Sequence, residues 1–351
     1  MMTSVFEHAD FDDHESVTLL CDKDAGLKAV VAVHSTVLGP AAGGTRLWQY
    51  ASSADGITDA LRLSRAMSLK NAMAGIPHGG GKGVIMRPEG DFDRDALFSA
   101  YGKGLNRIGG SYYTAEDVGV SPDDMRAIRA HTPFVAGLEE GAAASGDPSP
   151  ITADGVFRCL KSAIFHKLGL EKLSGISVAI QGLGSVGYSL AEHLHKSGAR
   201  LVVSDINQAV LHKAQQELGA AIVSPDDIYD APVDVFAPCA LGGAVNEQSV
   251  GRIHAKIICG AANNQLEKPE MADALMERDI LYCPDYVVNG GGIINVASEL
   301  SGTYDKNWVC AKLDGLVETL NVVIIKSENV GENTDKIAET IALSRISNAR
   351  A

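Results

Sequence analysis

The sequence lacks the features of a membrane-spanning, secreted or nucleic-acid-binding protein. Its 351 residues contain no run of 18 apolar residues, the length that indicates a transmembrane helix. The N-terminus has no basic region followed by an apolar stretch, so we predict no signal peptide. Lysine and arginine (30) are outnumbered by aspartate and glutamate (44), and the net charge of −14 disfavours nucleic acid and anionic membranes as partners. We therefore expect a soluble, cytoplasmic protein.

Cysteine is scarce, and its spacing excludes the common cysteine-based sites. The six cysteines lie far apart in the sequence, without a C-x-x-C pair, at positions 21, 159, 239, 259, 283 and 310. Most of them lie in apolar runs, so buried, reduced thiols are favoured over disulfides or zinc ligands. No set of His, Cys and acidic residues has the spacing of a metal site, and no G-x-S-x-G motif marks a nucleophile. The sequence therefore predicts no bound metal.

Glycine is abundant, with 37 residues, and one cluster of it has the pattern of a dinucleotide site. Residues 182–187 (GLGSVG) match G-x-G-x-x-G and follow an apolar strand candidate at 176–180. Val186, Leu190 and Leu194 then recur every four residues, as on the buried face of a helix. A strand, a glycine turn and a helix in this order predict pyrophosphate binding, the alternative being a tight turn that binds nothing. The predicted contacts are Gly182, Gly184, Ser185, Val186 and Gly187.

An acidic residue follows the next strand candidate, at 201–203. Asp205 lies 18 residues after Gly187, about where a carboxylate that binds the ribose hydroxyls is found in dinucleotide folds. Its negative charge would repel a 2′-phosphate. The sequence therefore predicts NAD rather than NADP as the cofactor.

Three more strand candidates follow, at 233–237, 256–259 and 280–283, and each ends in a polar or glycine-rich loop. These loops span 238–243, 260–265 and 285–292. In an open α/β sheet the loops at the carboxyl ends of the strands form the ligand crevice. We therefore predict cofactor contacts from the following loop residues: Cys239, Ala240, Ala261, Asn263 and Asn289.

The N-terminal part of the chain also alternates strands and helices. Strand candidates lie at 27–33, 84–86 and 112–114, with another strand or sheet edge at 43–48, and helix candidates lie at 52–74, 93–108 and from Ser121 onward. Residues 1–26 are predicted to form a short helix and a turn, and residues 137–150 a linker. A helix is predicted at 152–168, and the chain after residue 304 is predicted to be mostly helical. The length and this pattern indicate an α/β protein of two domains.

A second glycine cluster, GGGKG at 79–83, surrounds Lys82. It is not a Walker A motif, because Ile76 stands where that motif requires glycine and Gly83 where it requires Ser or Thr. One interpretation is a flexible loop with a solvated lysine, since lysine is usually exposed. The other is that backbone or ligand approaches closely, which the surrounding glycines favour.

Taken together, several segments resemble the glutamate/leucine/phenylalanine/valine dehydrogenase family. They are GPAAGGTRLW (39–48), GGGKGVI (79–85), YTAEDVGV (113–120), QGLGSVG (181–187), APCALGG (237–243) and PDYVVNGGGIINVASEL (284–300). TAEDVG and SGDPSPIT (145–152) are similar to the short leucine- and valine-type members. The resemblance implies a substrate-binding and oligomerisation domain at 1–137 and a Rossmann NAD-binding domain at 138–326, with a cleft between them. It also implies a homo-oligomer and a C-terminal helix, about 327–351, that packs back on the first domain.

The resemblance also implies roles for individual residues. Lys82 would be the catalytic lysine, Asp117 its acid/base partner, and Lys70 the cation that holds the substrate α-carboxylate. The other implied contacts are Gly43 and Gly44 beside the carboxylate, Ala42 and Ala115 in the side-chain pocket, Asn289 beside the nicotinamide, and Thr152 at its carboxamide. Taken singly, Lys70 could equally be a solvated helix residue, and Asp117 or Asn289 a turn residue.

The implied reaction is the NAD-dependent, reversible oxidative deamination of a branched-chain L-amino acid to the 2-oxo acid and ammonia. Ala42 stands where leucine-type enzymes are expected to carry a bulkier leucine, which leaves the substrate open. The alternatives are a phenylalanine or other aromatic amino-acid dehydrogenase and, in another class, an NAD-binding sensor without catalysis. The presence of Lys70, Lys82 and Asp117 together argues against the sensor.

Overall fold

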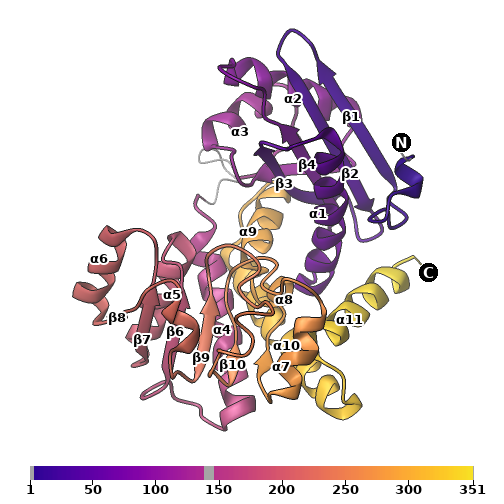
Figure 1. Cartoon of the computed structure of the whole chain (residues 1–351). Coiled ribbons are helices and arrows are strands. Elements are labelled where there is room, and N and C mark those ends of the chain that lie inside the picture. Colours follow the sequence, from indigo (N-terminus) through magenta and orange to yellow (C-terminus); the bar gives the residue numbers. More distant parts are fainter. Residues whose placement is uncertain (1–3, 138–145, 351) are drawn as a thin grey trace. The chain divides into compact units, whose positions relative to one another are not determined.

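The computed structural model describes residues 4–137 and 146–350, which form two compact units (Figure 1). Unit 1 comprises Met1–Asp147, Ile293–Val309 and Ala342–Ala351, and unit 2 comprises Pro148–Gly292 and Cys310–Ile341. The two-domain α/β fold is thus confirmed. Most of the predicted linker at 137–150, including the predicted boundary at 138, lies outside the described residues.

Unit 1 is built on a mixed five-stranded sheet with the order β1-β2-β4-β3-β5. The strands are β1 (Ser16–Asp22), β2 (Leu27–Ser35), β3 (Ala41–Trp48), β4 (Gly79–Met86) and β5 (Tyr112–Glu116). β2 pairs antiparallel with β1 and β4, whereas β3 pairs parallel with β4 and β5. β3 therefore lies inside the sheet, so the strand predicted at 43–48 is confirmed and the alternative of a sheet edge there was wrong.

Two elements of unit 1 differ from the sequence-based expectation. The N-terminal segment forms only a three-residue 3-10 helix, Val5–Glu7, and its main element is the edge strand β1. Along β1 only Leu20 is buried, so the alternation that reveals a half-buried strand is almost absent. β4 begins at Gly79, five residues before the predicted start at 84, and it includes the whole glycine cluster.

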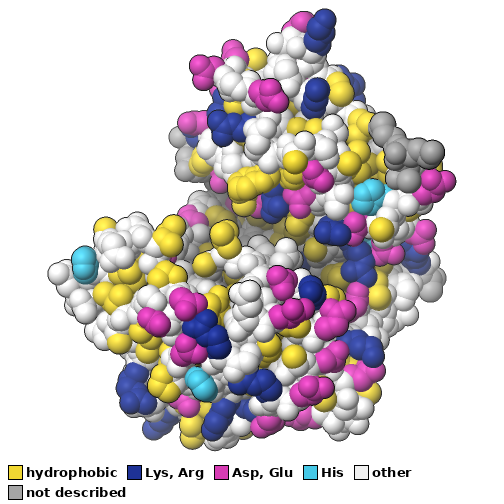
Figure 2. All heavy atoms as spheres, viewed as in Figure 1, with side chains coloured by type: hydrophobic (Ala, Val, Ile, Leu, Met, Phe, Trp, Pro, Cys, Tyr) yellow, Lys and Arg dark blue, Asp and Glu magenta, His cyan; other side chains and the backbone are white. Residues whose placement is uncertain are grey.

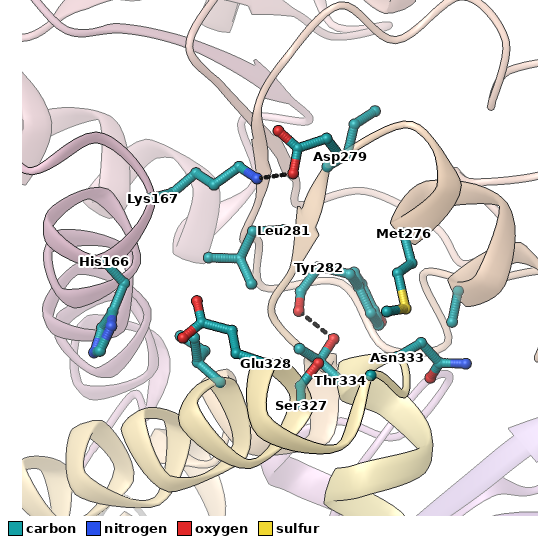
Figure 3. A pocket seen from close by; sticks show the side chains of 14 residues that line it. His166, Lys167, Met276, Asp279, Leu281, Tyr282, Ser327, Glu328, Asn333 and Thr334 are labelled. Carbon is teal, nitrogen blue, oxygen red and sulfur yellow. Dashed lines mark hydrogen bonds and ion pairs between the residues drawn. The ribbon is translucent and has the colours of Figure 1, made fainter.

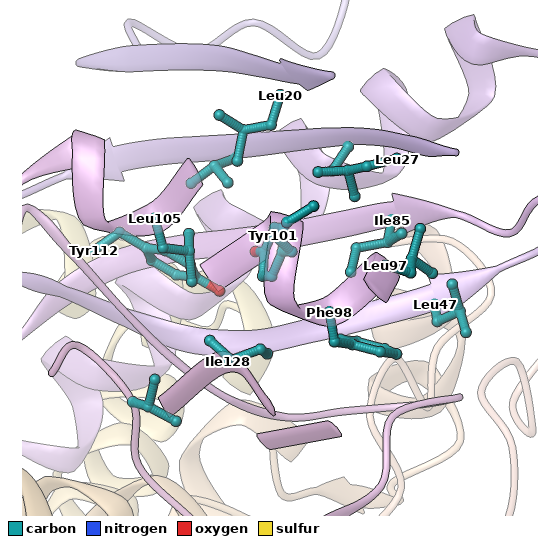
Figure 4. Close-up of a cluster of buried hydrophobic side chains, with 14 of the residues drawn as sticks. Leu20, Leu27, Leu47, Ile85, Leu97, Phe98, Tyr101, Leu105, Tyr112 and Ile128 are labelled. Carbon is teal, nitrogen blue, oxygen red and sulfur yellow. The ribbon is translucent and has the colours of Figure 1, made fainter. Parts of the chain in front are cut away.

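Helices cover both faces of this sheet. α1 (Ser53–Ala74) packs on one face, where Ala60 and Leu61 meet Val30, Ala32 and Val84. α2 (Arg94–Ile108) and α3 (Pro122–Arg129) cover the other face, and their apolar side chains form the larger core (Figure 4). Each helix begins as predicted, because the side chains of Ser52, Asp93 and Ser121 accept a backbone N–H at its N-terminus.

Unit 2 contains a six-stranded parallel sheet with the order β11-β10-β9-β6-β7-β8. Its strands are β6 (Ser177–Gln181), β7 (Arg200–Ser204), β8 (Ala221–Ile222), β9 (Val235–Pro238), β10 (Ile257–Ile258) and β11 (Leu281–Tyr282). The chain builds outward in one direction from β6 and in the other from β9, so the strand order reverses between these two neighbours. This is the Rossmann arrangement, and ligands bind where the order reverses, at the carboxyl ends of the strands.

The helices of unit 2 are α4 (Ser149–Leu168), α5 (Ser185–Lys196), α6 (Gln208–Leu218), α7 (Glu270–Glu277) and α8 (Asp285–Val288), with a 3-10 turn at Asp227–Asp230. The segment predicted as a loop at 285–292 instead contains α8 and the start of α9 (Gly291–Leu300). It turns into helix because Val287 and Val288 are buried on the inside of the unit.

After residue 290 the chain passes from one unit to the other within three helices, which are α9, α10 (Lys306–Val330) and α11 (Thr334–Asn348). The last turns of α11 belong to unit 1, where Arg345 donates to the carbonyls of Ala72 and Met73 at the C-terminus of α1. Among the described residues, no helix is long and apolar enough to cross a membrane. Figure 2 shows acidic and basic side chains interspersed on the visible face, so the net negative charge is spread over it rather than gathered in one patch.

Candidate active site

The glycine turn after β6 is shaped by packing at two of its three glycines and is open at the third. Gly182 has φ +97°, and a Cβ there would lie 2.8 Å from the Cβ of Ala240. A Cβ at Gly187 would lie 2.1 Å from the carbonyl oxygen of Gly182. A Cβ at Gly184, in contrast, would have no protein atom within 4 Å. The chain therefore needs glycine at 182 and 187 for its own packing, whereas the space at Gly184 is left for a ligand.

The same turn begins α5, and the N-terminus of this helix is suited to an anion. Gly184 is the N-cap residue and has no side chain to bond the first amides. Ser185, Val186 and Gly187 therefore present backbone N–H groups at the positive end of the helix dipole. Together with the open space at Gly184, these donors can hold the pyrophosphate of a dinucleotide.

Asp205 lies beside this turn, just after β7. One of its carboxylate oxygens accepts the N–H of Leu183 at 2.6 Å, and the other accepts the N–H of Asn207 at 2.8 Å. The carboxylate is thus held at the edge of the glycine turn, where ribose hydroxyls would reach it. Ile206, which the sequence reasoning missed, follows directly and is 91% exposed, so it offers an apolar surface next to the carboxylate.

The loop after β9 is tied to this turn, and the loop after β10 is tied to the residue that follows α8. The N–H of Cys239 donates to the Gln181 carbonyl at 2.7 Å, and Ala240 packs against Gly182. In the loop after β10, Ala261 and Asn263 accept the side-chain amide of Asn289, the residue that follows α8, at 3.1 Å to the Ala261 carbonyl and 3.0 Å to Asn263 Oδ1. The Oδ1 atom of Asn289 is buried and has no partner among the described residues, so an acceptor is available there.

Two further residues of unit 2 belong to this group. Thr152, on α4, packs against the glycines after Asn289, since a Cβ at Gly292 would lie 3.0 Å from its Oγ1. Asp285, which the sequence reasoning missed, accepts the N–H of Asn264 at 2.9 Å and so holds the loop after β10. Asn264 has φ +52°, a conformation that needs such support. The structure thus gathers the predicted nucleotide residues of unit 2 at the carboxyl ends of its strands.

In unit 1, Lys82 and Asp117 form a close ion pair. Lys82 lies in β4 and is 5% exposed, and its Nζ lies 2.6 Å from Asp117 Oδ2. The interpretation of residues 79–83 as a flexible loop was wrong. A Cβ at Gly80 would lie 2.1 Å from the backbone nitrogen of Ser68 on α1, and one at Gly83 would lie 2.1 Å from the Tyr101 hydroxyl on α2. The glycines are therefore needed because helices approach β4 closely from both faces.

A second cation, Arg46, binds the same carboxylate. Its Nε lies 3.2 Å from Asp117 Oδ2, and its Nη1 lies 3.0 Å from Asp59 Oδ2 on α1. The Tyr50 hydroxyl donates to that same Asp59 oxygen. Burial of Asp117 opposes its ionisation, but the charges of Lys82 and Arg46 outweigh burial and lower the pKa of Asp117 below the ordinary aspartate value. Arg46 lies in the segment 39–48 that carries the family resemblance, but the sequence reasoning gave it no role.

The remaining predicted residues of unit 1 lie in β3, β5 and α1. Ala42, Gly43 and Gly44 lie in β3, and Gly44 pairs with Ala115 in β5. A Cβ at Gly44 would lie 2.8 Å from the Cβ of Asp117, so glycine is required beside the acid. Lys70 is half-buried near the end of α1, and its neighbour Asn71 donates to the Ala42 carbonyl at 3.2 Å and the Gly79 carbonyl at 2.6 Å. This part of α1 therefore lies directly over β3 and β4.

A separate cavity of about 200 Å³ lies at the amino end of β11, among α4, α7, α10 and β11 (Figure 3). The residues lining it include Lys167, which pairs with Asp279 at 2.5 Å, and Thr334, which donates to the Tyr282 carbonyl at 2.6 Å. None of the predicted site residues lines it. Within the part of the chain that is described, no three His, Cys, Asp or Glu side chains are placed to hold a metal ion.

Comparison with known proteins finds relatives along both units. A family model described as Glu/Leu/Phe/Val dehydrogenase, dimerisation domain, matches residues 14–133, and one described as Glutamate/Leucine/Phenylalanine/Valine dehydrogenase matches 145–218 and 207–350. A leucine dehydrogenase of Bacillus cereus is 43% identical over 350 residues, which is 100% of this chain and 95% of that protein. A valine dehydrogenase of Streptomyces albus is 41% identical over 98% of this chain and 95% of that protein. The crystal structure of L-tryptophan dehydrogenase from Nostoc punctiforme matches with a TM-score of 0.84 at 40% identity, covering 96% of this chain and 97% of that chain.

Proposed function

This chain belongs to the glutamate/leucine/phenylalanine/valine dehydrogenase family, and we propose that it catalyses the NAD-dependent, reversible oxidative deamination of branched-chain L-amino acids. The family places it among the NAD(P)-dependent amino-acid dehydrogenases, which are oxidoreductases that act on CH–NH2 groups. The observation that carries the choice of substrate is identity of 41–43% with leucine and valine dehydrogenases over nearly the whole chain.

The choice of NAD rests on the residues of unit 2. The open space at Gly184 and the free first turn of α5 fit a pyrophosphate, and Asp205 fits a pair of ribose hydroxyls. Ser185, Val186, Cys239 and Ala240 would border the diphosphate, and Thr152, Ala261, Asn263 and Asn289 the nicotinamide. Asp205 carries the negative charge that would repel the extra phosphate of NADP.

The chemistry would be carried by unit 1. Bound NAD would supply the acceptor for the hydride that leaves the substrate Cα. Lys70 would hold the α-carboxylate as a point charge. Asp117 would move the proton on and off the amino nitrogen, and Lys82 would take the proton from the water that adds to the imine. The 2.6 Å contact between Lys82 and Asp117 supports this assignment, since a proton can pass directly between the two groups.

A second candidate is an aromatic amino-acid dehydrogenase. The similarity to L-tryptophan dehydrogenase in sequence and in fold favours it, and so do the small side chains of Ala42 and Ala115, which are both buried in unit 1. A pocket lined by alanine leaves room for a larger substrate. We rank this candidate second because the leucine dehydrogenase of Bacillus cereus is 43% identical over 100% of this chain, against 40% over 96% for L-tryptophan dehydrogenase.

The test is a substrate screen with the purified full chain, in which NADH formation is followed by absorbance. We expect leucine, valine and isoleucine to have the highest kcat/KM and NADP to replace NAD poorly. Much faster turnover of tryptophan or phenylalanine would establish the second candidate. If no amino acid gave NADH although NAD binds, the protein would be an NAD-binding sensor and the proposal would be wrong.

The proposal also includes a homo-oligomer in the cytoplasm. The description of the model that matches residues 14–133 as a dimerisation domain supports self-association. Light scattering of the purified chain would measure the assembly, and a monomer at micromolar concentration would contradict this part of the proposal.

A further inference from the structure

The Asp117 carboxylate is shared by two cations that bind the same oxygen. Lys82 Nζ lies 2.6 Å from Asp117 Oδ2, and Arg46 Nε lies 3.2 Å from it. We propose that Arg46 is a positioning residue, which shares the Asp117 carboxylate with Lys82 and thereby lets Lys82 exchange its proton during turnover. This inference rests on the proposed function, in which Lys82 acts as a base.

The need for a second cation follows from the geometry of the ion pair. A carboxylate 2.6 Å from an ammonium stabilises the charged lysine, so it opposes the release of the proton that a base must give up in each cycle. A guanidinium bound to the same oxygen partly neutralises the carboxylate and weakens its attraction for the Lys82 ammonium. Arginine suits this task because it stays charged at every working pH, whereas a lysine could itself lose its proton.

Arg46 is fixed in place by partners on a different element. Its Nη1 lies 3.0 Å from Asp59 Oδ2 on α1, and the Tyr50 hydroxyl donates to that same oxygen. Arg46 itself lies in β3, so its side chain bridges the sheet and the helix. Burial of the guanidinium lowers the pKa of Arg46, but Asp117 and Asp59 outweigh burial and raise it above the ordinary value. A lysine at position 46 would keep the charge but could not span both carboxylates with a planar fork.

Two further ionisable groups that interact with these charges lie on β5 and on α1. On β5, the buried Tyr112 hydroxyl donates to the Gly43 carbonyl and feels the charge of Asp117. On α1, the largely exposed Arg62 pairs with Asp10 at 2.7 Å and only feels the charge of Asp59. Arg62 therefore offers a matched control, because its removal takes the same charge from the same unit without touching Asp117.

The experiment compares the pH dependence of kcat/KM for the amino acid in the wild type and in three variants of the full chain. Arg46→Gln removes the charge, Arg46→Lys keeps the charge but loses the fork, and Arg62→Gln is the control. In Arg46→Gln, Lys82 is the one of the two cations that still binds Asp117. We therefore expect the rising limb of the plot of kcat/KM against pH to move up by about one pH unit, which is a tenfold loss of kcat/KM on that limb. Arg46→Lys should leave the limb in place but lower kcat by about 10- to 100-fold, the scale of a slight misplacement of reacting groups. Arg62→Gln should match the wild type in both respects.

A further variant tests whether Asp59 holds the Arg46 guanidinium in place. Asp59→Asn leaves the Arg46 charge on Asp117 but weakens one of its two anchors, so kcat should fall while the limb stays where it is. A limb that is unmoved in Arg46→Gln would overturn the inference, because loss of a merely structural residue would lower activity at all pH values alike. An equal shift in Arg62→Gln would also overturn it, since the effect would then be one of general charge.

A measurement without turnover separates this inference from the proposed function. In the ligand-free protein labelled with 13C-aspartate, the carboxyl signal of Asp117 is identified by its loss in Asp117→Asn. We expect this carboxyl to titrate at a higher pH in Arg46→Gln than in the wild type, and an identical titration would refute the role of Arg46. If the wild type formed no NADH with any amino acid, the proposed function would fail while this titration still decided the role of Arg46.

Discussion

The carboxylate of Asp285 accepts the backbone N–H of Asn264 at 2.9 Å and so ties α8 to the loop that follows β10. Its other oxygen accepts the Tyr282 hydroxyl, also at 2.9 Å. The two contacts hold Asn264 at φ +52°, between Asn263, which bonds Asn289, and the buried Gln265. Asp285 thus determines the shape of the loop that we expect to border the nicotinamide, although it touches no substrate itself.

We predict that Asp285→Ala weakens NAD binding by about tenfold or more, since a hydrogen bond to a charged group contributes roughly 1.5–3 kcal/mol. Asp285→Asn should bind NAD more tightly than the alanine variant, because the amide oxygen can still accept the N–H of Asn264. Titration of the protein with NADH, followed by fluorescence, gives the two dissociation constants. Unchanged affinity in Asp285→Ala would mean that the loop keeps its shape without this carboxylate.

The glycine turn allows a prediction that separates folding from binding. Gly184→Ala should leave the thermal unfolding temperature nearly unchanged, because no protein atom lies within 4 Å of the added Cβ, but it should weaken NAD binding. Gly187→Ala should instead destabilise the protein, because its Cβ would lie 2.1 Å from the Gly182 carbonyl oxygen. Calorimetry and NADH titration of both variants test this. Tight NAD binding by Gly184→Ala would show that the pyrophosphate lies elsewhere.

Substitution of Lys82 and substitution of Lys70 should change different kinetic constants. Lys82→Ala should lower kcat by roughly a hundredfold or more, the scale for removing a general base. Its NAD affinity should stay near that of the wild type, because the nucleotide residues belong to unit 2. Lys70→Ala should act mainly by raising KM for the amino acid, since a carboxylate contact is shared by ground and transition states. Steady-state kinetics with NAD titration distinguish them, and a near-normal kcat in Lys82→Ala would remove Lys82 from the chemistry.

The preference for NAD should depend on Asp205. Asp205→Ala removes the charge that repels a 2′-phosphate, so the ratio of kcat/KM for NAD to that for NADP should fall. The variant also loses the acceptor of the Leu183 N–H, so its absolute activity with NAD should fall as well. Equal kcat/KM for NAD and NADP in the wild type would contradict the assignment.

Stability should depend on pH through Asp335 on α11. Burial, and then the nearby charges of Asp285 and Glu339, raise the pKa of this carboxyl from 3.8 to about 7. Because the folded state holds the proton up to a higher pH than the unfolded state, stability should fall as pH rises from about 4 to 7 and stay low above it. Asp335→Asn should therefore raise the free energy of unfolding at pH 8, by roughly 1–3 kcal/mol after allowance for partial exposure. Denaturant unfolding at pH 5 and pH 8 tests this, and an equal gain at both values would point to another cause.

Features that depend on neighbouring residues could be predicted from the sequence. Ser52, Asp93 and Ser121 cap helices because the side chain of each accepts the backbone N–H three residues ahead. The strand, glycine turn and helix from 176 to 196 likewise depend on residues close together in the sequence. The two-domain α/β fold and the family followed from such segments.

Other features were decided only by contacts between distant parts of the chain. The edge strand β1 has almost no alternation of its own and exists because it pairs with β2. β4 extends through four glycines because α1 and α2 press on it from both sides, although glycine by itself suggests a loop.

The contacts around Asp117 show most clearly that sequence patterns do not reveal contacts between distant residues. Lys82 lies 35 residues before Asp117 and Arg46 71 residues before it, so no spacing in the sequence relates the three. The motif resemblance assigned roles to Lys82 and Asp117 and none to Arg46, because the guanidinium reaches the carboxylate only after β3, β5 and α1 have packed together. The sequence by itself therefore determined the local elements and the kind of chemistry. The tertiary structure decided which charges meet at Asp117, because an ion pair depends on distance in space and not on separation along the chain.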